Sequence, residues 1–343
     1  MELVQNNPIL ASYIQTIALE VDNTCMGHFQ YPPLLAIMHA ASSFGTSPKI
    51  FLHIGYHWSL IDELVNLPFP SNTLTPILNA PQTILHAVTD IQIKRMNVAI
   101  PVSLFRLLPN LRLVHGSRFF LSSVDDKSSD NCSSEDHTVK YFRPKLDVLI
   151  LDLCNLDTVE MLCEQIDLSA IQELVLSWIQ MGATGTDNMN PNARVVGPFY
   201  DLSRLQHLRR CTFGLEVQGG TNPVPHLCQL LHTLPPLPEH NLEYLYLSFY
   251  LTNTPLDAND ISNSHVIFSI NTWSKVDNAL VNVISSGTRP FTLTLAFYIP
   301  TRNNSVKSSL KKLFVDWVRK YLTKSSRQPN LNIVIHQRYF YSS

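Results

Sequence analysis

Histidine and cysteine recur at short spacing in two segments, where they could bind a metal ion. His53 and His57 lie four residues apart, a spacing that presents two imidazoles to one ion only on a helix, but FLHIGYHW alternates like a strand. Cys228 and His232 would share a helix face in PHLCQLLHTL, which also contains His226. A structural zinc site needs four ligands, and no second pair lies close by in the sequence. We therefore interpret both groups as packed or surface residues, and we expect no metal or other cofactor.

Motifs for nucleophilic catalysis or phosphate binding are missing from the sequence. It contains no GxSxG, no HExxH and no GxxxxGK followed by Ser or Thr. The stretches after Met181 and at Gly219 lack the lysine and the strand-to-helix setting of a phosphate-binding loop. We expect these stretches to be loops, and we expect the protein to be a binding module and not an enzyme.

Composition narrows the kind of partner. Hydrophobic residues make up 45% of the 343 residues and charged residues 15%, which predicts a large buried core. The net charge of −2 gives no reason to expect a nucleic-acid or membrane-surface partner. No apolar run approaches the roughly 20 residues of a membrane span, and no signal peptide is visible. We expect a cytoplasmic or nuclear protein whose six scattered cysteines are buried thiols.

The elements that would position binding residues come from an apolar pattern that recurs along the chain. The pattern is apolar-x-x-apolar-x-apolar, and its last two positions share one face of a short strand. It occurs at Ile14, Ile17 and Leu19, at Val88, Ile91 and Ile93, at Leu108, Leu111 and Leu113, at Leu146, Leu149 and Leu151, at Ile171, Leu174 and Leu176, at Leu208, Cys211 and Phe213, and at Leu242, Leu245 and Leu247. Looser versions surround Ile50, Phe291 and Ile333. Such a unit cannot bury its apolar face alone, so it must stack on its neighbours.

Segments between these strands have helical spacing, notably residues 156–166 and residues 272–285, the latter after a capping Asn271. The predicted fold class is α/β: an irregular leucine-rich-repeat-like solenoid over residues 1–343, with a parallel sheet and helices on its outer face. The alternative is an ordinary α/β domain with Leu-rich strands. A doubly wound fold would place a glycine-rich turn after an early strand, and the 11 glycines of this chain form no such turn, which favours the solenoid.

Two further segments have their own character. Residues 122–138 are serine-rich and acidic without apolar periodicity, so we expect a flexible insertion. Residues 305–343 should form a C-terminal capping helix followed by a strand. The helix has an apolar stripe that includes Phe314 and Trp317 and a face rich in Lys and Arg. A membrane-surface or acidic-partner helix is the alternative to a cap that packs on the last repeats.

Residues between the apolar strand positions should lie on the concave face of such an arc, where solenoids bind their partners. The predicted partner-binding residues are Asp90, Gln92, Lys94, Glu173, Arg210, Tyr244 and Tyr246, with Val148, Ile150, Asp152, Val175, Ser177 and Thr212 on the same face. Tyr and Arg are enriched at binding hot spots, which favours Arg210, Tyr244 and Tyr246. The alternative is a solvated sheet without a partner.

A family resemblance is carried by three segments: NPILASYIQTIALEV from Asn7, LHAVTDIQIKRMNVAIPVSLFRLLPNLRLV from Leu85 and HNLEYLYLSFY from His240. Together they resemble the C-terminal region of fungal, basidiomycete-type F-box proteins. In that family the F-box docks the adaptor of a cullin-based ubiquitin ligase, and a degenerate leucine-rich-repeat region captures the substrate. The resemblance therefore implies a protein partner of unknown identity, and the ligase adaptor if an F-box lies upstream.

This sequence departs from the family pattern because no F-box is visible before the first repeat-like strand. We expect that an upstream exon supplies it or that this is a paralogue without one. The predicted function is thus the substrate-recognition region of an F-box-like protein. The alternative is a stand-alone scaffold without a ubiquitin-ligase link, and an enzyme ranks below both.

Overall fold

The structure, a computed structural model, describes part of the chain. The described residues are 7–21, 31–55, 74–94, 99–122, 143–152, 154, 156–177, 205–217, 227–228, 231–232, 241–251, 270–284, 290–300 and 304–340. They belong to two compact units, Met1–Leu168 and Ser169–Ser343, which we call unit 1 and unit 2. The expectation of one solenoid over residues 1–343 stays a prediction.

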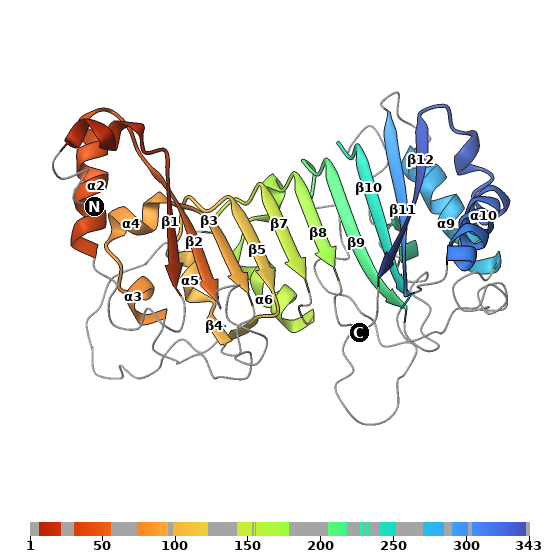
Figure 1. The fold of residues 1–343 in the computed structure, drawn as a ribbon, viewed down its shortest axis with the longest axis horizontal. Coiled ribbons are helices and arrows are strands. Elements are labelled where there is room, and N and C mark those ends of the chain that lie inside the picture. Colours follow the sequence, from red (N-terminus) through yellow and green to blue (C-terminus); the bar gives the residue numbers. More distant parts are fainter. Residues whose placement is uncertain are drawn as a thin grey trace. The chain divides into compact units, whose positions relative to one another are not determined.

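Unit 1 contains five parallel strands that lie side by side in the order in which they occur along the chain (Figure 1). They are β1 (Thr16–Val21), β2 (Lys49–Gly55), β3 (Val88–Lys94), β5 (Leu113–Ser117) and β7 (Val148–Asp152). Two short strands, β4 (Ala99–Pro101) and β6 (Phe120–Ser122), pair separately. The parallel arrangement of strands with helices between them confirms the predicted α/β class.

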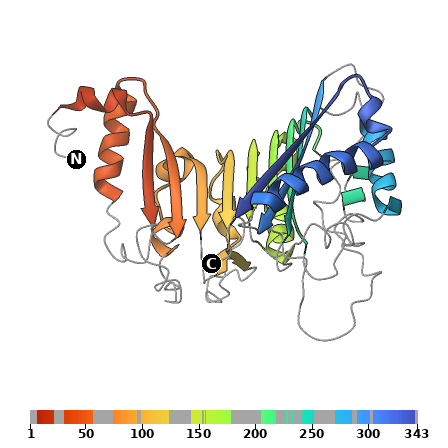
Figure 2. The same ribbon diagram turned by 45° about the vertical axis from the view of Figure 1, so that its right-hand side comes forward.

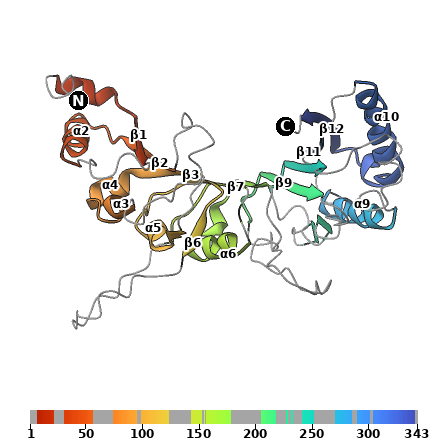
Figure 3. The same cartoon turned by 60° about the horizontal axis from the view of Figure 1, so that its bottom comes forward.

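The helical segments of unit 1 connect these strands. They are η1 (Pro8–Tyr13), α2 (Tyr31–Ser43), α3 (Thr75–Leu78), α4 (Gln82–Ala87), α5 (Ser103–Arg106) and α6 (Leu156–Gln165); a short turn, η4 (Leu168–Ala170), follows. Helices α3 to α6 lie on one side of the strands (Figure 3). Arg106 Nε on α5 donates a hydrogen bond of 2.7 Å to Gln165 Oε1 on α6. The two helices are therefore joined on this side of the sheet.

Unit 2 repeats the arrangement with five strands, again parallel and in chain order. They are β8 (Glu173–Ser177), β9 (Arg210–Val217), β10 (Tyr244–Leu251), β11 (Phe291–Pro300) and β12 (Leu331–Phe340). Helices α9 (Ile270–Ile284) and α10 (Asn304–Tyr321) lie next to one another on one side of the strands, and the turn η7 (Ser325–Arg327) follows α10 (Figures 2 and 3). None of the helices that the structure describes is long and apolar enough to cross a membrane.

An aromatic cluster forms the core of unit 2 between the strands and the two helices. Phe297 on β11 stacks on Phe249 of β10 with ring centroids 5.3 Å apart and on Phe314 of α10 at 4.0 Å. Trp273 on α9 meets Trp317 on α10 edge to face at 4.2 Å. Offset and edge-to-face aromatic pairs contribute about 0.5–1.5 kcal/mol beyond the burial of their area. Phe314 and Trp317 of the apolar stripe of α10 thus pack in this core, and the capping role of residues 305–343 stays a prediction.

The alternation predicted from the apolar pattern holds in most strands. Leu149 and Leu151, Leu174 and Leu176, and Leu245 and Leu247 are all buried. The helix predicted over residues 156–166 is α6, and the one predicted over residues 272–285 is α9, which begins earlier, at Ile270, so Asn271 lies inside the helix and does not cap it. Beyond Ser122, the predicted insertion 122–138 lies outside the described residues.

One strand was placed in the wrong register. The pattern predicted Leu113 as a core residue of β5, but Leu113 is half-buried, and Val114 and Gly116 face the helices instead. The apolar skeleton of this strand begins at Leu111 and not at Leu108, because Val114 and Gly116 pair with Leu149 and Leu151, so the alternation is shifted by one residue from the predicted one. Gly116 suits this position because a Cβ there would lie 2.2 Å from the Phe119 ring.

A buried carboxylate on α9 holds the chain that follows α10. Asp277 is 3% exposed. Its Oδ2 accepts a hydrogen bond of 2.9 Å from the backbone N–H of Lys324, and its Oδ1 accepts one of 2.8 Å from that of Ser325. The Ser325 hydroxyl also donates to Asp277. These contacts satisfy the N–H groups of Lys324 and Ser325, at the start of η7, and tie this part of the chain to α9.

We predict that Asp277→Ala lowers the free energy of unfolding by about 2–4 kcal/mol, because several buried donors lose a charged acceptor at once. Asp316→Ala is the matched control, since Asp316 is exposed on α10 and should change stability by about 0.5 kcal/mol or less. Urea unfolding followed by tryptophan fluorescence measures both. Equal stability of the two variants would contradict the role given to Asp277.

The predicted burial of the thiols is confirmed for Cys154, Cys163, Cys211 and Cys228; Cys25 and Cys132 lie outside the described residues. Burial raises the pKa of the Cys154 thiol to about 12 and that of Cys228 to about 11.

Because the thiolate is the reactive form, we predict that at pH 8 iodoacetamide leaves Cys154 and Cys211 unmodified in the folded protein and alkylates both in urea. Mass spectrometry of tryptic peptides measures the difference, and rapid labelling of either thiol in the native protein would refute it.

Candidate functional site

In both units the polar side chains gather on the face of the strands that points away from the helices. We call this the opposite face. Residues alternate along each strand, so that residues such as Leu149 and Leu151 face the helices and every second residue, polar or apolar, lies on the opposite face. In parallel pairing, residues on adjacent strands that share a register position become neighbours. The opposite face therefore consists of rows of side chains that run across the strands.

Unit 1 carries two such rows, which we call the polar rows. The first row consists of Glu20, His53, Gln92 and His115 on β1, β2, β3 and β5. The second row consists of Gly55, Lys94, Ser117 and Asp152 on β2, β3, β5 and β7. Titratable and hydrogen-bonding side chains are thus concentrated next to one another near the carboxyl ends of these strands.

A side-chain hydrogen bond in the first row sets the chemistry of His115. Gln92 Nε2 lies 3.0 Å from His115 Nδ1, and because an amide nitrogen only donates, Nδ1 accepts. The proton of the neutral imidazole is then on Nε2. Burial, and secondly the positive charge of Lys94, lower the pKa of His115 below its ordinary value of 6.5. At neutral pH His115 is therefore an uncharged donor through Nε2–H.

The second row combines a cation with a hydroxyl and a carboxylate. Burial lowers the pKa of Lys94 from its ordinary value of 10.5. Ser117 Oγ donates to Asp152 Oδ2 over 3.4 Å, a long and therefore weak hydrogen bond. This row places a lysine one strand away from a serine and two strands away from an aspartate.

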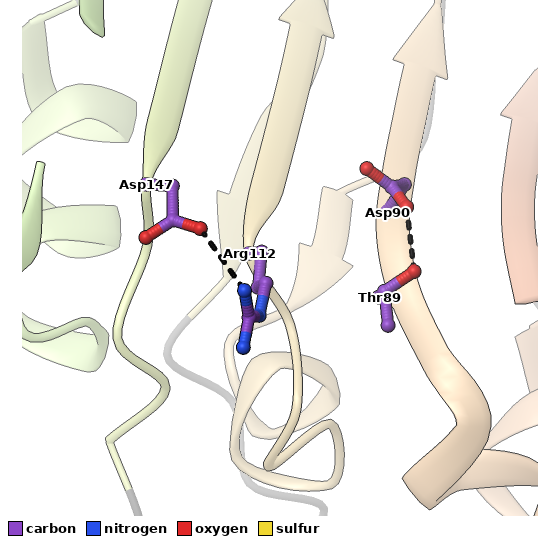
Figure 4. A network of polar contacts seen from close by, with 4 residues as sticks. All are labelled: Thr89, Asp90, Arg112 and Asp147. Atoms are coloured by element: carbon purple, nitrogen blue, oxygen red, sulfur yellow. Dashed lines mark hydrogen bonds and ion pairs between the residues drawn. The ribbon is translucent and has the colours of Figure 1, made fainter. Parts of the chain in front are cut away.

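Further polar contacts lie at the start of the same strands (Figure 4). The Thr89 hydroxyl donates to Asp90 Oδ2 over 2.6 Å and so orients that carboxylate. Arg112 Nη1 lies 3.6 Å from Asp147 Oδ2, with the two side chains 68% and 38% exposed. Water screens such a pair, which contributes about 0–1 kcal/mol. The Thr89–Asp90 bond lies within one strand, and the exposed Arg112–Asp147 pair contributes little, so these contacts are not a candidate site.

Unit 2 presents aromatic and basic side chains on its opposite face. Arg210 on β9 and Tyr244 on β10 share a register position. Tyr244 is 49% exposed, and Arg210 Nη1 lies 3.8 Å from Glu173 Oε2 on β8. The Tyr244 ring and the Arg210 guanidinium are part of a larger surface that includes further tyrosines on β10 and β11.

Three tyrosines further along the strands contact one another directly. Tyr250 on β10 stacks on Tyr298 on β11 with ring centroids 4.4 Å apart. Tyr246 is hydrogen bonded to Tyr298, and burial followed by this bond raises the pKa of Tyr246 well above its ordinary value of 10.0. Arg338 on β12 places its Cζ 5.9 Å from the Tyr298 ring centroid, within cation–π range. We call Tyr244, Tyr246, Tyr250, Tyr298, Arg210 and Arg338 the tyrosine patch.

All seven residues predicted to bind a partner lie on the opposite face. Asp90, Gln92 and Lys94 lie together on β3 of unit 1. Glu173 on β8, Arg210 on β9, and Tyr244 and Tyr246 on β10 lie in unit 2. The structure therefore places them in two separate groups, and their role in binding remains a prediction.

The sequence reasoning missed residues in both groups. His115 and Ser117 were hidden by the register error at Leu113, which assigned their positions to the core side of β5. Tyr250, Tyr298 and Arg338 lie beyond the apolar pattern that marked each strand. The signal that could have found Tyr250 is the continued alternation after Tyr246.

Of the candidate metal ligands, His53 lies in the first polar row, whereas His57 and His226 fall outside the described residues. Among the residues with described positions, no three His, Cys, Asp or Glu side chains are grouped to hold a metal ion.

The shifted titration of His115 gives a pH prediction. The unfolded chain protonates His115 near pH 6.5, whereas the folded chain holds it neutral to lower pH. The free energy of unfolding that comes from keeping His115 neutral is therefore fully present above pH 6.5. It is lost as the pH falls through the interval between the unfolded and folded pKa values of His115.

In Lys94→Met the pKa of His115 should rise partway to 6.5, because burial, the larger cause, remains. An NMR titration of the imidazole measures both proteins, and an unchanged pKa in the variant would contradict the coupling.

The chain was compared with known proteins by sequence and by structure. No protein-family model, no curated protein and no solved structure matches it. The assignment of a function therefore has to come from the polar rows and the tyrosine patch themselves.

Proposed function

We propose that the chain is a protein-binding module and that the tyrosine patch is its binding surface. The observation that carries the proposal is the contact of Tyr246, Tyr250, Tyr298 and Arg338 on the face opposite α9 and α10. Tyr and Arg are the residue types that dominate binding energy in protein interfaces, together with Trp.

The rigidity of the patch favours binding. A tyrosine has only two side-chain torsions, and the stack of Tyr250 on Tyr298 together with the hydrogen bond from Tyr246 restricts them before any partner arrives. Immobilising a flexible side chain at an interface costs about 0.5–1.5 kcal/mol. A pre-ordered patch avoids much of this cost, so more of the contact energy contributes to affinity.

The charges of the patch narrow the partner. Arg338 lies over a ring and Arg210 is 66% exposed beside Glu173. Guanidinium groups form bidentate hydrogen bonds with carboxylates. The patch therefore suits a protein segment that combines apolar or aromatic side chains with Asp or Glu.

The order of the strands supports a repeat architecture. In unit 1 the strands β1, β2, β3, β5 and β7, and in unit 2 the strands β8 to β12, lie side by side in chain order, while the short strands β4 and β6 pair separately. Such an order is the arrangement that stacked strand–helix repeats produce. We propose that the chain is an irregular leucine-rich-repeat-like solenoid, in which the face opposite the helices is the face that binds partners.

The resemblance to fungal F-box proteins suggests what the partner is for. In that version of the proposal the tyrosine patch captures the substrate of a ubiquitin ligase, and an F-box supplied upstream binds the ligase adaptor. The alternative is a stand-alone scaffold that uses the same patch without a ligase. Both versions make the same prediction for the patch and differ in whether the adaptor accompanies the protein.

We predict that the double variant Tyr246→Ala/Tyr298→Ala and the single variant Tyr244→Ala lose partner proteins. The loss of a hot-spot residue costs about 2 kcal/mol or more, which is roughly a 30-fold weakening of Kd. Tyr13→Ala is the matched control, because Tyr13 is 76% exposed in unit 1. The measurement is affinity purification of the protein tagged at its own gene, with quantitative mass spectrometry, followed by the Kd of the purified partner.

Circular dichroism establishes that the variants remain folded. Loss of the same proteins in both patch variants, with retention in Tyr13→Ala, would support the proposal, whereas equal capture by all four proteins would contradict it. The cullin adaptor among the captured proteins, unaffected by the patch variants, would favour the ubiquitin-ligase version. Its absence would favour the stand-alone scaffold.

A further inference from the structure

We propose that the polar rows of unit 1 bind an oxyanion, a phosphate or carboxylate group, between Lys94 and His115. This site lies in the other unit from the tyrosine patch and does not depend on the proposed function. Lys94 and His115 lie on adjacent strands, β3 and β5, one row apart on the same face. This diagonal placement, with about 7–8 Å between the backbone positions, lets two long side chains reach one bound group.

The groups that these two side chains offer are hydrogen-bond donors. Gln92 occupies His115 Nδ1, so the ring presents Nε2–H. The Lys94 ammonium has three N–H donors and no acceptor. Ser117, next to Lys94 in the second row, adds a hydroxyl that is only weakly engaged at 3.4 Å by Asp152. A ligand that accepts several hydrogen bonds and carries negative charge matches this set, because charge-assisted hydrogen bonds are the stronger ones.

Gly55 leaves the row without a side chain beside Lys94. The two residues share a register position on β2 and β3. Gly55 has a φ of +144°, and a Cβ there would lie 2.1 Å from the Lys94 carbonyl oxygen, so only glycine fits. The backbone therefore excludes any side chain that would cover Lys94 from β2, and the ligand group can approach from that direction.

Acidic groups limit how strongly the site binds. Three carboxylates lie on the same face: Asp90 on β3, Asp152 on β7 and, further along the first polar row, Glu20 on β1. Asp90 and Asp152 each accept a hydroxyl hydrogen bond, from Thr89 and Ser117 respectively. Their negative charge opposes an anion and restricts it to the position between the two donors. We expect free ions to bind with a Kd on the order of 1 mM; a ligand with further contacts would bind more tightly.

The test is an NMR titration of the whole protein with inorganic phosphate or with acetate at constant ionic strength. The readout is the His115 imidazole resonances and their pH dependence. A bound anion offsets the charge of Lys94, so the pKa of His115 should rise as the site fills. Lys94→Met removes the cation and should abolish the response. Lys49→Met is the matched control, because Lys49 is an exposed lysine at the start of β2 on the same face, and it should respond like the unmodified protein.

Each outcome decides the proposal. A saturable response in the unmodified protein and in Lys49→Met, absent in Lys94→Met, supports it. A response to phosphate alone identifies a phosphate ligand, and a response to acetate alone identifies a carboxylate. No saturable response to either ion, or an equal response in Lys94→Met, overturns the proposal. Because no residue of unit 2 takes part, the result is independent of the tyrosine patch.

Discussion

The strands of both units depend on one steric constraint: successive side chains of a strand point to opposite sides. Helices cover one side, so apolar residues such as Ile91 and Leu247 are confined to that side. The residues between them are excluded from the core. They are therefore not restricted to apolar types, and polar residues can accumulate there at little cost in stability. In this fold the division between residues that stabilise and residues that can bind is thus made by the backbone.

Parallel pairing places the residues outside the core next to one another on adjacent strands, so that they form continuous surfaces. In a parallel sheet the register between neighbouring strands decides which side chains meet. One register brings Gln92 to His115, and another brings Tyr250 to Tyr298. Both pairs join strands separated by long connections. The two surfaces differ because unit 1 places charged and imidazole groups in its rows, whereas unit 2 places phenol rings there.

The α/β class, several helices and the face of the predicted binding residues could be derived from the sequence, because these features depend on local periodicity. Register could not. The run Leu111–Leu113 fits the apolar pattern as well as Leu149–Leu151 does, yet the strand is shifted by one residue and Gly116 takes the core position below Phe119. No local rule shows that an aromatic ring several residues away replaces a missing side chain. The contact between Tyr298 and Arg338 likewise depends on the register between β11 and β12, and that register is set by the connection between the two strands.

The buried carboxylate of Asp277 has a consequence for the order of assembly. Its hydrogen-bond donors follow it by 47 and 48 residues in the sequence. While the chain is being synthesised, α9 therefore leaves the ribosome with a carboxylate that has to stay hydrated until Ser325 emerges. Burial of α9 and arrival of the C-terminal segment are coupled, since an ionised carboxylate is not buried without its donors. A chain that ends before Ser325 would leave the Asp277 carboxylate without these donors, so α9 could not be buried there as it is in the complete unit.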